Sequence, residues 1–424
     1  MSDRPAYPQH YEYIKDWLQS RDGIWKTKEG LVKILGDSDE MRLEIDQFSL
    51  LGEQLTDRML RRNINKHPFA FYTLDDVRRN AFAVVPARCS VVLLTTGVIE
   101  RLRAIGGQVP TNVAAIFHTQ SGQGSRLAKM WGQTPQTEEY FKAFAGLLTH
   151  AALSFLIHHE LAHLVLGHEV QWRKQMVAGK AASDEDSGSL CFGEEQYLSG
   201  TGAQEEGRND GNQALELDAD IHALFYTRDH LNEMRAGLAL ARLRGPLEPF
   251  DALFHSILEQ ELGMRYVLAA ASAIALLSLV RGDKEDRPPS LGSPSHPQVS
   301  VRILAAIRAH FAMAPELAED SVADVSTEVL AFVLALIGTL RLDTRALELL
   351  ERGESITDAA LSEVTADSVY EGYGLNLTRE EMDRLDSHID ALAEDMRSYA
   401  LGMSGSVRAS LEDRHKWYAA AGST

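Results

Sequence analysis

The chain has 424 residues, of which 45% are hydrophobic and 24% charged, as in an ordinary soluble globular protein. Its formal net charge of −19 disfavours nucleic acid as a partner, because phosphate binding needs a basic surface. Only two cysteines occur, Cys89 and Cys191, so a disulfide scaffold and a cysteine-rich zinc knuckle are excluded.

The apolar segments are too short to predict a membrane protein. The N-terminal segment carries charges and prolines, unlike a signal peptide. The longest apolar runs, at 266–280 and 329–340, fall short of the roughly 18 to 20 residues that a membrane span needs. We interpret both runs as buried core helices, and we expect a cytoplasmic protein with no integral membrane span.

In chain order, the pattern predicts a mostly helical chain of the α+β class. Residues 10–66 combine spaced apolar residues with many charges, which is typical of helices. Residues 81–94 hold two β-rich runs separated by a turn that contains proline, which predicts a β-hairpin or a small sheet. A long apolar helix then begins near Thr134, its expected N-cap, and ends at Gly167.

Two polar segments interrupt the second half of the chain. Residues 178–213 are rich in glycine, serine and acidic residues, which indicates a mobile insertion or a lid before a helix resumes near Ala214. A second loop rich in proline, glycine and serine covers 282–295. We therefore expect one domain over 1–312, with a helical N-terminal part and the insertion at 178–213, and an additional helical region over 313–424.

The main chemical signal is His159-Glu160-Leu161-Ala162-His163, an HExxH motif on the long helix. Residues four apart on a helix share a face, so both imidazoles can bind one tetrahedral ion. Glu160 is suited to activate a metal-bound water as general base. The surroundings are apolar, and unpaired buried polar groups cost about 1–3 kcal/mol each, so a metal ion would explain the motif. The alternative is a chance motif whose histidines bond to backbone or water.

A third ligand would identify the class of metal site. The class with a third histidine soon after the motif fails, because Glu169 stands at that position; His168 is one residue off and is expected to face elsewhere. A later segment offers Glu216 as a ligand, with Asp220 one turn on to accept a hydrogen bond from a ligand histidine. Asp218 would point away and be solvated or a cap. The alternative is an ordinary acidic helix face.

HExxH followed by Glu216-x-x-x-Asp220 resembles the gluzincin metallopeptidases. Two further elements are similar to the HtpX-like and CAAX-prenyl-protease group: Asn80-Ala81-Phe82-Ala83 with Thr95-Thr96-Gly97, and His296-Pro297 with Arg302-Ile303. Members of that group usually carry transmembrane helices, so this chain would be a soluble relative. The soluble Lit phage-exclusion peptidases are a second candidate relative.

The resemblance implies a zincin-like core and a role for each matching residue. The Zn²⁺ ligands would be His159, His163 and Glu216. Glu160 would be the general base, and Asp220 would support a ligand histidine.

The resemblance also implies roles around the cleft. His296 would steady the oxyanion, and Arg302 would pair with acidic groups behind the site. An edge strand that aligns a peptide by backbone pairing would contain Ala81, Phe82 and Ala83. The plain alternatives are a helix start at His296 and a surface position for Arg302.

The sequence therefore predicts a soluble zinc-dependent endopeptidase that acts on a protein or peptide. The main alternative is a non-catalytic, zinc-stabilised sensor or interaction protein. A third interpretation is a membrane-associated protease that uses residues 266–280 as a hairpin.

Overall fold

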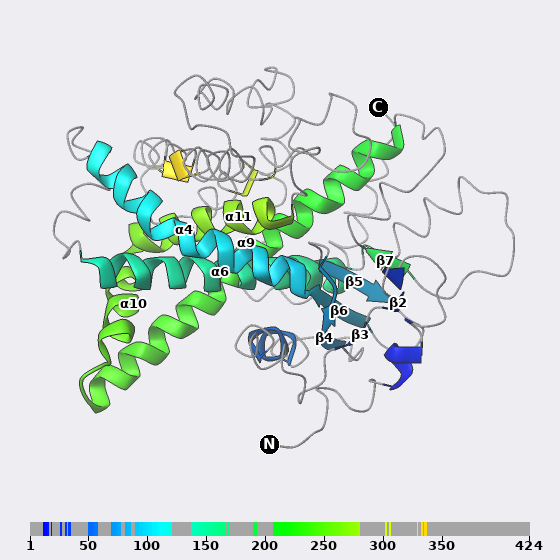
Figure 1. The fold of residues 1–424 in the computed structure, drawn as a ribbon, viewed down its shortest axis with the longest axis horizontal. Coiled ribbons are helices and arrows are strands. Elements are labelled where there is room, and N and C mark those ends of the chain that lie inside the picture. The colour runs from blue at the N-terminus through cyan, green and yellow to red at the C-terminus, as the bar shows by residue number, and fades with distance from the viewer. Residues whose placement is uncertain are drawn as a thin grey trace, which may run out of the picture.

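The fold is known from a computed structural model, shown in Figure 1. The structure describes residues 12–16, 18, 26–27, 30–31, 33–34, 50–57, 69–77, 81–85, 90–120, 137–166, 168, 190–192, 207–279, 302, 305–306, 329, 332–333 and 335–336. The described part is mostly helical with a small mixed sheet, so the α+β prediction is confirmed at that level. Nearly all of the predicted C-terminal region, 313–424, lies outside the described residues.

The elements follow one another along the chain from a strand-rich start to a helical second half. The strands are β1 (Lys26–Thr27), β2 (Gly30–Leu31), β3 (Lys33–Ile34), β4 (Phe69–Asp75), β5 (Ala81–Val85), β6 (Ser90–Thr95) and β7 (Leu190–Phe192). The helices are α4 (Thr96–Gln120), α6 (Glu138–Val165), α9 (Gly207–Arg244), α10 (Pro249–Glu259) and α11 (Glu261–Leu279).

The helical prediction for residues 10–66 is wrong in its middle. Helical residues at 12–16 and 50–57 flank three short strands. β1 pairs with β2, and β3 pairs with β4. Gly30 weakens a helix here, while the β-branched Ile34 favours extended backbone.

The main sheet has the strand order β3-β4-β6-β5-β7. The predicted hairpin is confirmed, because β5 and β6 are antiparallel neighbours. β4 has no counterpart among the predicted elements, and it pairs in parallel with β6. Its sequence begins with four apolar residues in a row, Phe69 to Tyr72, and six of its seven residues are buried. A continuous apolar run without alternation gives no strand period to detect.

β5 is not the edge strand that the sequence predicted. β7, which lies within the polar segment 178–213, pairs with β5 and places Phe192 opposite Ala83. On its other side β5 pairs with β6 along Ala81 to Val84. β7 therefore occupies the outer edge of β5 at Ala83, so that residue cannot align a peptide by backbone pairing there. Within the described residues, the pairing with β7 does not extend to Ala81 and Phe82.

The two faces of the sheet join two separate cores. Ala81 and Ala83 face the helical layer, and their side chains belong to the large cluster that contains α4, α6 and α11. Phe82 points to the opposite face, where it packs in a smaller cluster with Ile14 and Leu18. The alternation of side chains along a strand explains this split.

α6 is the central helix of the fold, and α4, α9 and α11 pack around it (Figure 1). It begins at Glu138, and its cap is Thr137 rather than Thr134, which lies outside the described residues. The Thr137 hydroxyl accepts a hydrogen bond from the Tyr140 N–H at 3.3 Å. Glu138 and Glu139 add negative charge to the first turn, where the helix dipole favours it.

Two apolar helices bear on the membrane prediction. α11 is almost wholly buried from Met264 to Leu276, as expected for a core helix. Among the described helices, α6 has the length and apolarity to cross a membrane, and 72% of its apolar window is buried inside the fold. A core helix of a globular domain has the same length and composition.

Candidate metal centre

The HExxH motif lies in the last turns of α6, where α9 crosses it. His159, Glu160 and His163 are at most 5% exposed, although the helix around them is apolar. α9 begins at Gly207, earlier than the predicted Ala214, and brings a buried Glu216 to the same place. Three metal-binding side chains from two helices therefore meet in the interior.

The three predicted ligands form a compact triangle. The Nε2 atoms of His159 and His163 lie 3.1 Å apart. Glu216 places Oε2 at 3.3 Å from the first of these nitrogens and Oε1 at 3.5 Å from the second. Ligands about 2.0–2.2 Å from a tetrahedral zinc ion are separated by about 3.3–3.5 Å. One ligand atom from each of the three residues lies within 4.8 Å of the other two, so this buried group could hold a metal ion.

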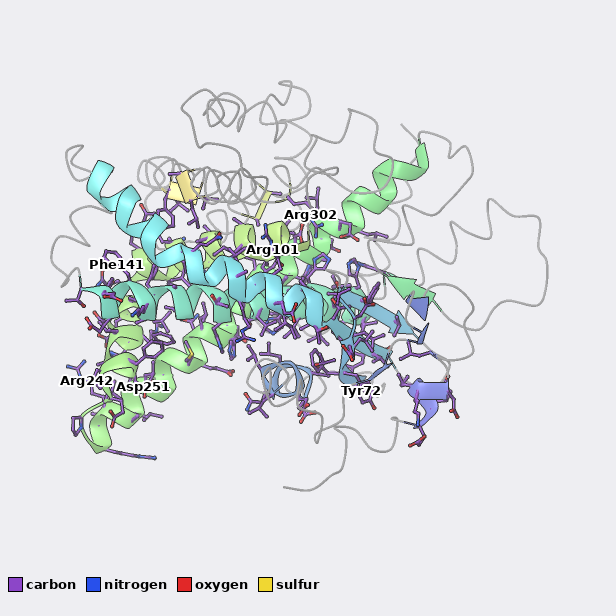
Figure 2. The ribbon with its side chains drawn as sticks, in the orientation of Figure 1. Tyr72, Arg101, Phe141, Arg242, Asp251 and Arg302 are labelled. Carbon is purple, nitrogen blue, oxygen red and sulfur yellow. The ribbon has the colours of Figure 1, made fainter. Side chains whose placement is uncertain are left out.

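Asp220 and Arg302 support one side of this triangle. Oδ1 of Asp220 lies 2.9 Å from Nδ1 of His159. Arg302 donates two hydrogen bonds to the Asp220 carboxylate, at 2.7 and 2.9 Å, and its Nη2 lies 3.4 Å from Oε2 of Glu216. Arg302 is 2% exposed, so its interpretation as a surface residue is wrong. Figure 2 shows its position beside α9.

The charges of this group are balanced within the protein interior. Burial disfavours charge on His159, but hydrogen bonds and charge from Asp220 and Glu216 outweigh it and raise the pKa of His159 to about 10. Burial would raise the pKa of Asp220, but Arg302 and His159 hold it below its usual value. The charged forms of His159 and Asp220 therefore stabilise each other, and Arg302 adds to the stabilisation of Asp220.

His163 has a different set of partners, which the sequence did not predict. Its Nδ1 lies 2.9 Å from Nδ1 of His168, and Nε2 of His168 lies 3.2 Å from Oδ2 of Asp218. His168 and Asp218 are 2% and 0% exposed. Both expectations, that His168 faces elsewhere and that Asp218 is solvated or a cap, are therefore wrong.

The physical reason is the end of α6. α6 ends at Val165, with Leu166 as its C-cap, so the helical period that predicted the direction of His168 is interrupted before that residue. Asp218 does lie on another face of α9 than Glu216, but that face is also buried. Burial lowers the pKa of both His163 and His168, with nearby carboxylates opposing the shift.

The remaining predicted residues have different outcomes. Glu160 is 5% exposed and adjacent to His159, about 100° around the helix. His296 lies outside the described residues. Ala81 and Ala83 lie on the sheet face that packs against α6.

The donor set has a clear chemical preference. Two imidazoles and one carboxylate suit a borderline divalent ion such as Zn²⁺, and three protein ligands leave a fourth position for water or substrate.

A comparison with protein families, curated proteins and solved structures finds no match to this chain.

Proposed function

We propose that this chain is a zinc-dependent endopeptidase with a zincin-like core, a relative of the gluzincin group that its motifs resemble. Its substrate would be a protein or peptide, and its place of action the cytoplasm. The observation that carries the proposal is the buried group of His159, His163 and Glu216. The two histidine Nε2 atoms lie 3.1 Å apart, and each lies within 3.5 Å of a Glu216 carboxylate oxygen, close to the ligand separation around one tetrahedral ion.

Each residue of the site has a role in this reaction. Zinc held by the three ligands would supply a Lewis acid and lower the pKa of a water molecule. Glu160 accepts a proton from the attacking water and returns it to the leaving amine. Asp220 holds the His159 imidazole with Nδ1 facing the carboxylate, which directs Nε2 toward the other two ligands. Arg302 keeps Asp220 ionised and in place.

The test combines metal analysis with one isosteric substitution. We expect about one zinc per chain, lost on His163→Ala and on Glu216→Ala, because the remaining two ligands bind zinc weakly. Glu160→Gln should keep the zinc and the fold, yet lose roughly 10²–10⁴-fold in the hydrolysis of an unfolded basic protein, the effect of a positioned general base. A basic substrate suits a chain with a net charge of −19.

Matched controls separate local from general effects. Glu139→Gln makes the same change at an exposed position of α6 and should leave hydrolysis unchanged. His255→Ala removes a buried histidine of α10 and should keep the zinc. Equal hydrolysis by wild type and Glu160→Gln would refute the mechanism. Tight zinc without hydrolysis in either protein would support the non-catalytic, zinc-stabilised alternative.

A further inference from the structure

We propose that His168 and Asp218 form a positioning relay that fixes the tautomer and orientation of the ligand His163. The inference rests on the proposed function, because it concerns the same metal site. It gives a role to two buried polar residues that the HExxH and Glu216-x-x-x-Asp220 motifs do not include.

The directions of the hydrogen bonds follow from the chemistry of imidazole. A neutral imidazole carries one N–H, and a metal-binding nitrogen carries none. If Nε2 of His163 binds the ion, its proton is on Nδ1, which donates to Nδ1 of His168 at 2.9 Å. His168 then carries its own proton on Nε2, which donates to Oδ2 of Asp218 at 3.2 Å. Each hydrogen-bond donor in the series from His163 through His168 to Asp218 therefore meets an acceptor.

The opposite pair of tautomers, with protons on Nδ1 of His168 and Nε2 of His163, is unfavourable at both histidines. A proton on Nδ1 of His168 would leave the lone pair of its Nε2 facing the Asp218 carboxylate. It would also place the proton of His163 on Nε2, toward Glu216 and the ion position. The carboxylate of Asp218 therefore selects the tautomer of His168, and His168 selects that of His163.

The relay is held in place from both elements that build the site. His168 stands three residues after the end of α6 in the sequence, so it is close along the chain to the helix that carries the motif. Asp218 is part of α9, one turn before His222, whose Nδ1 lies 2.8 Å from the Asp218 backbone oxygen and 3.0 Å from its Oδ1. All three residues are at most 5% exposed, so water competes little for their polar atoms.

The two ligand histidines are thus supported in two different ways. Asp220 contacts His159 directly, at 2.9 Å, whereas Asp218 acts on His163 through the imidazole of His168. Both carboxylates come from the same helix as Glu216. Support of this kind is typically worth 10–100-fold in metal affinity.

The test measures zinc affinity by chelator competition and the visible spectrum of the cobalt(II)-substituted protein. His168→Phe keeps a ring but removes both polar atoms, so we expect zinc affinity to fall 10–100-fold and the cobalt spectrum to change. His168→Gln supplies one acceptor and one donor, and it should recover most of the affinity and the wild-type spectrum. Asp218→Asn retains the shape and should lower the affinity less than His168→Phe.

Controls and outcomes distinguish this inference from the proposed function. His255→Phe changes another buried histidine, at 3% exposure on α10, and should leave affinity and spectrum unchanged. If wild type binds no metal, the proposed function and the relay are both refuted. If wild type binds zinc but His168→Phe matches it in affinity and spectrum, only the relay is refuted. Equal losses in His168→Phe and His168→Gln would assign His168 to packing alone and refute the relay. If both His168 variants fail to fold, Asp218→Asn decides the case: a lower zinc affinity than wild type supports the relay, and an unchanged affinity refutes it.

Discussion

Replacing Arg302 by methionine should strongly destabilise the metal-free protein. The guanidinium is 2% exposed and makes two hydrogen bonds to Asp220, at 2.7 and 2.9 Å, with Glu216 at 3.4 Å. Arg302→Met would remove the guanidinium from the buried carboxylates of Asp220 and Glu216, and among the described residues of this site His159 would remain as their cationic partner. Breaking a buried ion pair from one side costs about 3–5 kcal/mol. A typical total stability is only about 5–15 kcal/mol.

The assay is urea unfolding with metal chelated. Arg302→Lys keeps the charge but not the paired geometry, so we expect an intermediate loss of unfolding free energy. Arg242→Met is the matched control, because Arg242 is exposed near the far end of α9 (Figure 2). The double variant Arg302→Met with Asp220→Asn should be more stable than Arg302→Met alone, since the uncompensated charge is gone. A loss below about 1 kcal/mol in Arg302→Met would refute the reasoning.

Two predictions concern the packing of α6. A methyl group on Gly106 of α4 would overlap Oγ1 of Thr149, so Gly106→Ala should lower the free energy of unfolding in urea by about 1–3 kcal/mol. Adding Thr149→Ala should restore most of that free energy. An unchanged unfolding midpoint in the single variant would show that the two helices separate easily. Burial lowers the pKa of His150 to about 4, whereas an unfolded histidine titrates near 6.5. Between these values the unfolded state binds a proton that the folded state does not, so the free energy of unfolding should fall as the pH drops from about 7 to 4. The expected loss is about 2 kcal/mol at pH 5. His150→Gln should show a smaller fall over the same range, and parallel curves for the two proteins would contradict the assignment.

The sequence predicted those site residues whose side-chain direction follows from the helical period. His159 and His163 share a face of one helix, and Glu216 and Asp220 share a face of another, so spacing alone placed each pair. Arg302 came from the resemblance, and the structure places it against Asp220, as expected. These residues all lie within regular helices or match a motif.

The residues that the sequence missed lie where the period ends or carries no information. His168 follows the last turn of α6, and Asp218 lies on a face of α9 that only tertiary packing buries. β7 is a strand of three residues in a polar segment, and its pairing with β5 overrides the local composition. Such features depend on contacts between distant segments, which local propensity does not encode.

The order of the site residues along the chain has a consequence for the timing of metal loading. His168 and its partner Asp218 are 50 residues apart, and Asp220 and Arg302 are 82 apart. At a synthesis rate of about 5–20 residues per second, Arg302 emerges roughly 4–16 s after Asp220. A nascent chain that has reached only the HExxH helix offers two imidazoles and no carboxylate from α9. We therefore expect the ion to bind only after Glu216 has joined the HExxH helix, and the support of Asp220 by Arg302 to form later than the ligand set itself.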